Sequence, residues 1–150
     1  MSTKILPAIQ MIGFGLLAAT IKLVLPMADF SFMARDLLVL LFILLALTLL
    51  LASGALFRYH RTTVNPVHPH KASALVISGL YRYTRNPMYL GFLSLLFAWV
   101  LYLGNAAAFL VLPIFVFSLN RLNIIPEEQA LQARFGEAYS AYQKQVRRWL

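Results

Sequence analysis

Donor groups and aromatic rings are concentrated between Tyr81 and Tyr89, directly ahead of a long apolar run. This short stretch holds three tyrosines, two arginines, an asparagine and a proline. Arginine can bind an anionic group, and a tyrosine ring can face a cation. A pair of carboxylates, Glu127 and Glu128, follows much further along the chain and suits an ammonium or hydroxyl groups. The residue types therefore allow polar binding chemistry between two distant segments.

A membrane helix that begins at this point explains each residue type separately. Asn86 suits the N-cap of such a helix and Pro87 its first position. Arg82 and Arg85 can reach headgroup phosphates, while the tyrosines fill an interfacial aromatic belt. The two glutamates suit the first turn of a helix that begins near Pro126, where the helix dipole favours negative charge. On local sequence alone both explanations stay open.

The composition places the chain among membrane proteins. Of its 150 residues, 61% are hydrophobic and only 12% are charged, whereas a soluble domain carries roughly a quarter charged residues. The net charge of +8 comes from basic residues between apolar runs, which indicates anionic lipid headgroups rather than nucleic acid as partner. The absence of cysteine excludes disulfides, thiolate metal sites and a cysteine nucleophile.

The apolar runs predict an all-α integral membrane protein with about four transmembrane helices. The uncharged stretch 88–119 is too long for one ordinary span, and Gly104-Asn105 near its middle is a turn signal. We therefore expect the last two helices to form a tight hairpin. We expect one domain over residues 1–150, with a cytoplasmic connecting loop at 58–86 and a cytoplasmic C-terminal segment at 120–150. The predicted spans are about 5–25, 37–57, 88–103 and 106–119.

The distribution of basic residues predicts the orientation of these spans. Eleven of the 13 lie ahead of the first span, between the second and third, or after the fourth. Only Lys22 and Arg35 remain for the other side. By the positive-inside rule, the N-terminus and the C-terminus are both expected in the cytoplasm.

The C-terminal segment has the pattern of one amphipathic helix. Gly136 weakens that helix by about 1 kcal/mol relative to alanine. Arg147, Arg148 and Trp149 at its end are typical of an interfacial anchor. The apolar stripe consists of Leu131, Phe135, Tyr139, Tyr142, Val146 and Trp149.

All three histidines lie in the connecting loop, at His60, His68 and His70. Pro66 and Pro69 predict irregular backbone there, and no cysteine or neighbouring carboxylate completes a ligand set. We therefore expect no metal site.

Two long stretches resemble a known family. The segment "LVISGLYRYTRNPMYLG" resembles a signature of isoprenylcysteine carboxyl methyltransferases and related phospholipid methyltransferases. The tail "PEEQALQARFGEAYSAYQKQVRRWL" is similar to their second signature, and the matches together cover roughly residues 61–150. The resemblance implies an integral membrane methyltransferase that uses S-adenosylmethionine at the cytoplasmic face. The loop and the RRWL ending resemble bacterial members, which implies the bacterial inner membrane.

The resemblance also implies which residues bind the cofactor. Arg85 joins this set on chemical grounds, as a charged donor for an anionic end of the ligand. No catalytic residue is assigned, because methyl transfer to an ionised carboxylate needs mainly positioning and exclusion of water. The residues carried over by position are Leu75, Val76, Tyr81, Asn86, Pro87, Met88, Tyr89 and Glu127.

The chain departs from the family pattern at two positions, one in the cofactor-binding set and one that concerns the acceptor. Asn86 replaces the usual histidine before proline, and Asn123 replaces an arginine that binds the substrate carboxylate in the eukaryotic enzymes. Arg121 is a possible substitute but faces another side of a helix, so Arg121, Asn123 and Glu128 form the candidate substrate-binding set. The acceptor is lipophilic or small, and the resemblance favours a prenylcysteine-like carboxylate. A phospholipid amine, a thiol, or a non-catalytic scaffold are the alternatives.

Overall fold

A computed structural model describes residues 6–60 and 74–150, and in this part of the chain every regular element is helical. The predictions for Lys4, Arg61, His68, His70 and Lys71 lie outside the described residues. The longer helices are α1 (Pro7–Val24), α2 (Arg35–Tyr59), α3 (Pro87–Leu103), α4 (Val111–Leu119), α5 (Ile125–Phe135) and α6 (Glu137–Gln145). The short turns are η1 (Pro26–Ala28), η3 (Gly79–Arg82), η4 (Ala107–Leu110) and the π-helical η5 (Asn120–Ile124).

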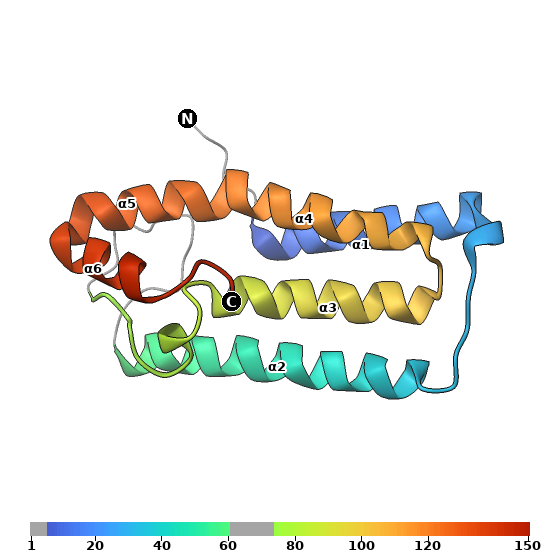
Figure 1. The fold of residues 1–150 in the computed structure, drawn as a ribbon, viewed down its shortest axis with the longest axis horizontal. Coiled ribbons are helices and arrows are strands. Elements are labelled where there is room, and N and C mark those ends of the chain that lie inside the picture. The colour runs from blue at the N-terminus through green and yellow to red at the C-terminus, as the bar shows by residue number, and fades with distance from the viewer. Residues whose placement is uncertain (1–5, 61–73) are drawn as a thin grey trace.

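The four long apolar segments lie side by side, with α3 packed along both α2 and α1 (Figure 1). Gly91 allows the close approach of α3 to α2, because a Cβ at this position would lie 2.9 Å from Leu50 Cγ. On the other side of α3, a continuous core forms between α1, α3 and α4. Its fully buried members are Ala18, Leu96, Val100, Val111, Phe115 and Leu119.

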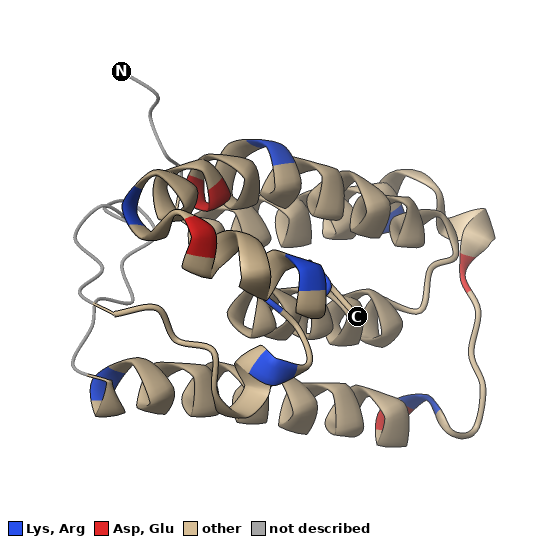
Figure 2. Cartoon of the chain, turned by 60° about the vertical axis from the view of Figure 1, so that its left-hand side comes forward, with Lys and Arg blue, Asp and Glu red and all other residues tan. Residues whose placement is uncertain are grey.

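Three helical stretches in the described residues are long and apolar enough to cross a membrane: Pro7–Val24, Arg35–Tyr59 and Ala107–Phe135. α3 is apolar but has only 17 residues. α2 leaves most of its leucines exposed, as expected for a helix that faces lipid. Figure 2 shows charged residues gathered at the two ends of the bundle, while the middle of α1, α2 and α3 carries none.

The chain reverses between α3 and α4 at the predicted turn residues. Gly104 has φ +63°, and a Cβ there would lie 2.8 Å from the Phe30 carbonyl oxygen, so the position requires glycine. Asn105 is fully buried behind it. α4 then runs back beside α3 (Figure 1).

The last long helix does not end at residue 119, where the predicted fourth span ends. Helical structure runs without interruption from Ala107 to Phe135 (Figure 1). Pro126 has no N–H for the Leu122 carbonyl, and the π turn at η5 accommodates it. Because α5 has no free N-terminus, the dipole explanation of Glu127 and Glu128 is wrong.

The tail is two helices and an extended end rather than one amphipathic helix. Gly136 adopts φ +50° and separates α5 from α6, so the glycine breaks the helix instead of only weakening it. After α6, Val146 is extended and the chain turns back toward the start of α3 (Figure 1). We call residues 146–150 the C-terminal strap.

Candidate functional site

The segment that leads into α3 is fixed between α2 and α6. Gly79 has φ +58° and lies against Leu56 of α2, where a Cβ would come within 2.8 Å of a methyl carbon. This turn buries the Tyr81 ring, which meets the Phe57 ring edge to face at 5.5 Å. The Tyr142 hydroxyl of α6 donates to the Tyr81 carbonyl at 2.7 Å. Tyr81 is therefore a wall of the site that both helices hold in place.

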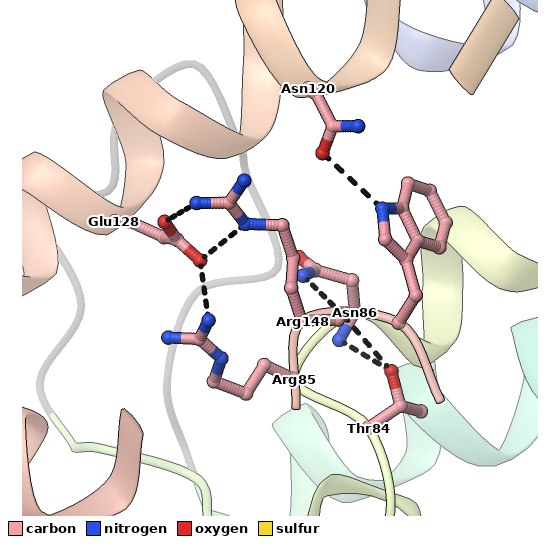
Figure 3. Close-up of polar contacts among 7 residues, drawn as sticks. Thr84, Arg85, Asn86, Asn120, Glu128 and Arg148 are labelled. Carbon is pink, nitrogen blue, oxygen red and sulfur yellow. Dashed lines mark hydrogen bonds and ion pairs between the residues drawn. The ribbon is translucent and has the colours of Figure 1, made fainter. Parts of the chain in front are cut away.

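The C-terminal strap crosses the start of α3. The Arg85 amide donates to the Arg147 carbonyl at 3.0 Å. The Asn86 side-chain amide donates to the Arg148 carbonyl at 2.8 Å (Figure 3). Thr84 Oγ1 also donates to the Arg148 carbonyl, at 3.3 Å. Asn86 occupies the predicted N-cap position ahead of Pro87, but its side chain binds the strap and caps no helix N–H. The asparagine thus joins two segments of the site.

The strap also corrects the prediction of an interfacial anchor at the end of the chain. Arg148 donates through Nε and Nη2 to the two carboxylate oxygens of Glu128, at 3.1 and 2.6 Å (Figure 3). The Trp149 indole donates to Asn120 Oδ1 at 3.3 Å and packs against the core. Both side chains are therefore used inside the protein.

The two glutamates of α5 bind different partners. Glu127 Oε2 accepts a hydrogen bond from the Tyr89 hydroxyl of α3 at 2.9 Å. Glu128 Oε1 forms an ion pair with Arg85 Nη2 at 3.2 Å, in addition to its bonds to Arg148 (Figure 3). The Arg85 and Glu128 side chains are only 11% and 12% exposed. The start of α3 and the start of α5, which are remote in sequence, meet through these contacts.

These segments enclose a cavity of about 240 Å³, slightly below the roughly 300–1,000 Å³ of typical small-molecule sites. Every residue expected at the cofactor lines it except Pro87, which is buried in the first turn of α3. The expected residues at the cavity are Leu75, Val76, Tyr81, Arg85, Asn86, Met88, Tyr89 and Glu127.

The candidate substrate-binding set is not brought together. Glu128 lines the cavity, but Arg121 and Asn123 do not. Arg121 is exposed, with its guanidinium 5.9 Å from the centre of the Phe117 ring. Asn123 is only 4% exposed and accepts a hydrogen bond from Gln10 of α1 at 2.6 Å. Both residues lie in the π turn η5, so their side chains point in directions that differ from those on a regular α-helix.

The cavity is also lined by residues that the sequence did not identify as site residues. The first turn of α1 supplies part of the wall, although its apolar sequence gives no signal of such a role. Tyr139 and Tyr142 did carry a signal, because both belong to the FGxxYxxY part of the second signature. The added residues are Leu6, Pro7, Ala8, Phe57, Ala74, Phe92, Ile124, Leu131, Tyr139 and Tyr142.

The cavity has a positive and a negative side. Arg85 Nε and Nη1 are buried and have no hydrogen-bond partner among the described residues. An unpaired buried donor costs about 1–3 kcal/mol, so the guanidinium is poised for an anionic group. Glu127 provides a carboxylate in the same cavity. The site suits a ligand that carries opposite charges.

The tyrosines around the cavity remain neutral near pH 7. Burial, with the Glu127 carboxylate adding to it, raises the pKa of Tyr81 far above its ordinary value. Burial likewise raises the pKa of Tyr139 to about 12, with a further contribution from Glu128. Burial also raises the pKa of Tyr142. These hydroxyls can donate hydrogen bonds but cannot act as bases at neutral pH.

No group of three or more metal-ligating side chains occurs within residues 6–60 and 74–150. His60, the one histidine in that part of the chain, pairs through Nε2 with Ser78 Oγ at 2.9 Å. It is not among the residues that line the cavity.

Comparison with known proteins connects this geometry to a family. Residues 34–138 match the phospholipid methyltransferase family. An uncharacterized protein of Haemophilus influenzae is 46% identical over 63 residues, which are 42% of this chain and the whole of that protein. The protein-S-isoprenylcysteine O-methyltransferase of Schizosaccharomyces pombe is 32% identical over 77 residues, 51% of this chain but only 33% of the yeast enzyme. No solved structure matches the chain at a significant level.

Proposed function

Because the chain belongs to the phospholipid methyltransferase family, we propose that it transfers a methyl group from S-adenosylmethionine to a lipophilic or small acceptor at the cytoplasmic face of a membrane. The observation that carries the proposal is the bond from Tyr89 to Glu127, which joins the two signature segments at one cavity. A prenylcysteine-like carboxylate is the favoured acceptor, and the name of the yeast relative supports it.

The donor groups of the cavity fit this cofactor. The two unpartnered nitrogens of Arg85 suit its carboxylate, and the Glu127 carboxylate suits its ammonium or ribose hydroxyls. The rings of Tyr81 and Tyr89 provide faces for adenine or for the sulfonium. We assign Leu75, Val76 and Met88 to apolar contacts with the same ligand. Pro87 contributes by fixing the start of α3 rather than by contact.

The protein's part in the reaction is mainly to position the reactants and to exclude water. When bound, the cofactor supplies an activated methyl group on a sulfonium that leaves as a neutral thioether. Tyr139 and Tyr142 of α6 line the cavity, and their rings limit the access of water. A carboxylate acceptor is already ionised near pH 7 and needs no base. Holding the methyl donor and the acceptor in line then supplies most of the rate enhancement.

An amine or thiol acceptor would require a proton acceptor in the cavity. Glu128 is held by Arg85 and Arg148, Glu127 accepts from Tyr89 and is assigned to the cofactor, and the tyrosines stay protonated. This arrangement favours the carboxylate over a phospholipid amine or a thiol. A non-catalytic scaffold would have no use for the buried, unpaired donors of Arg85.

The membrane arrangement is part of the proposal. We propose four spans in one domain, with α3 as a short third span and both termini in the cytoplasm of a bacterial cell. The site-forming ends of α2, α3 and α5 lie at the same end of the bundle (Figure 1), as this topology requires.

The proposal is tested by calorimetric titration of the detergent-solubilised protein with S-adenosylmethionine. Glu127→Gln should weaken binding by about tenfold or more, because a hydrogen bond to a charged group is worth roughly 1.5–3 kcal/mol. The matched control is Glu137→Gln, which changes an exposed glutamate outside the cavity. Equal affinity in both variants would refute the assigned pocket, and absence of binding by the unmodified protein would favour the scaffold.

The acceptor class is tested by transfer of a radiolabelled methyl group to matched lipophilic acceptors. A carboxylate acceptor should react at a rate that is nearly constant from about pH 6 to 8, because it is ionised throughout. An amine or thiol should react faster as the pH rises, because its unprotonated form becomes more abundant.

A further inference from the structure

A buried polar bridge joins α1 to the π turn η5, next to the cavity but outside its lining. Gln10 Nε2 donates to Asn123 Oδ1 at 2.6 Å, and Gln10 Oε1 accepts from Ser118 Oγ at 3.0 Å. Gln10 is only 7% exposed. In an apolar environment such bonds between helices are a main source of specific packing, so the bridge links the position of η5 to α1.

The spacing of the two partners shows what the bridge requires. Ser118 and Asn123 are five residues apart, which places them about 140° apart around a regular α-helix. In η5 the Ile125 amide instead bonds to the Asn120 carbonyl, five residues back. This wider turn brings Ser118 and Asn123 to the same side of the helix. One glutamine amide can therefore bind both only while the π turn is present.

The π turn in turn decides which residues of α5 face the cavity. The fully buried positions Val111, Phe115, Leu119 and Ile124 follow at steps of four, four and five residues, so one extra residue enters the repeat at η5. Beyond it, the face that lines the cavity carries Ile124, Glu127, Glu128 and Leu131. A regular α-helix would rotate the residues beyond η5 by about 100°. Pro126 would then take the place of Glu127 opposite Tyr89, Glu127 would take the place of Glu128, and Glu128 would leave the face that lines the cavity.

We propose that Gln10 is a positioning residue: by bridging Ser118 and Asn123 it holds the π turn and so places Glu127 opposite Tyr89 in the cavity. The proposal rests on the proposed function, in which Glu127 binds the cofactor. Gln10 lies outside residues 34–138, the part of the chain that matches the family. Asn123, expected at the substrate, is instead the residue through which α1 acts on the site.

The primary test measures S-adenosylmethionine affinity by calorimetry in detergent for Gln10→Met, a change that keeps the length of the side chain and removes the hydrogen bonds to Asn123 and Ser118. We expect about tenfold weaker binding, as for Glu127→Gln, since a misplaced Glu127 would lose its hydrogen bond to the cofactor. The matched control is Thr20→Val, because the Thr20 hydroxyl bonds only to the Leu16 carbonyl of its own helix among the described contacts. Unchanged affinity in Gln10→Met overturns the proposal.

A double-mutant cycle separates positioning from a general loss of structure. If Gln10 acts through Glu127, then Gln10→Met should weaken binding no further once Glu127→Gln is present. Losses that multiply overturn the proposal, because Gln10 would then act independently of Glu127. If Glu127→Gln alone leaves affinity unchanged, the assigned pocket fails and this inference fails with it. If only Gln10→Met is without effect, the pocket stands and the positioning role does not.

A second variant keeps the test decisive if Gln10→Met does not fold. Combining Gln10→Met with Ser118→Ala and Asn123→Leu replaces the three polar side chains of the bridge by apolar groups, so that none of the three is left without the other two, and such a joint replacement can be nearly neutral for stability. We expect this variant to fold, as judged by its melting temperature, and to bind the cofactor as weakly as Gln10→Met would. Full affinity in the folded variant overturns the proposal.

Discussion

The two ends of the helical bundle differ in how far their buried polar side chains are hydrogen-bonded. At the turn between α3 and α4, Asn105 is fully buried and donates to the Leu25 carbonyl at 2.8 Å and to Asp29 at 2.9 Å. Its side-chain oxygen accepts from the Ala108 amide at 3.1 Å. At the other end, Arg85 is nearly as buried, yet two of its nitrogens have no partner among the described residues.

The difference separates a residue that closes the fold from one that, in the proposed function, binds a ligand. Asn105 joins three segments, and backbone bonds between Phe30 and Gly104 and between Ala106 and Ala28 complete the closed end. Arg85 instead lines a cavity and leaves donors unpaired at a cost to stability. Substitutions at the two residues should therefore have opposite consequences for stability and for binding.

The largest effect on stability is expected for Asn105→Ala. It removes the three hydrogen bonds of the buried Asn105 side chain, which should lower the free energy of unfolding by about 2–4 kcal/mol. Thermal or denaturant unfolding in mixed micelles measures this loss. Cofactor affinity of the folded fraction should stay the same, because the turn lies at the end of the bundle away from the cavity (Figure 1). A loss of affinity without a loss of stability would contradict the comparison.

Arg85→Gln should show the reverse pattern. Losing a charged donor should weaken cofactor binding by about ten- to a hundredfold, since such bonds contribute roughly 1.5–3 kcal/mol. The melting temperature should stay constant or rise, because unpaired donors are removed while Arg148 still holds Glu128. Arg82→Gln is the matched control, an exposed arginine of the same segment. Destabilisation with unchanged affinity would make Arg85 a structural residue.

The closed end and the start of α3 could be predicted from local sequence because local rules determine them. Gly104-Asn105 indicated the turn, and Asn86-Pro87 indicated the first residue of α3. The two segments that resemble the family signatures contain most of the residues that line the cavity. Apolar runs likewise indicated the helices, although α3 is too short to count among the three clear candidates for a span.

The remaining features depend on contacts that no local pattern contains. The continuous helix through Pro126 exists because a π turn absorbs the missing N–H, and such turns have no sequence signature that we could read. The partners of Asn86 and Arg148 depend on the strap, whose path follows from the break at Gly136. A helix-breaking glycine and a merely weakening one look alike in sequence.

A smaller effect concerns alkaline pH and the buried tyrosines of the site. The pKa of Tyr139 is raised from 10.0 to about 12 in the folded protein, so the folded state favours the neutral ring. Its contribution to stability is complete below about pH 10 and is lost as the pH rises toward 12. Tyr139→Phe should therefore reduce the loss of stability over this range, measured by circular dichroism in detergent. An unchanged alkaline profile would show that the ring titrates as it does in the unfolded chain.

The smallest effect is expected for Arg121→Ala, which tests where the cavity ends. Arg121 lies on the exposed side of η5 above the Phe117 ring, and the contact of an exposed cation with a ring contributes only about 0.5–1 kcal/mol. Affinity for cofactor and for a carboxylate acceptor should change by less than about threefold, since that contact faces away from the cavity. A large loss of acceptor affinity alone would extend the site to the outer face of η5. Arg85 would then no longer be the main anion-binding group, and the comparison with Asn105 would have to include Arg121 as a second ligand-binding residue.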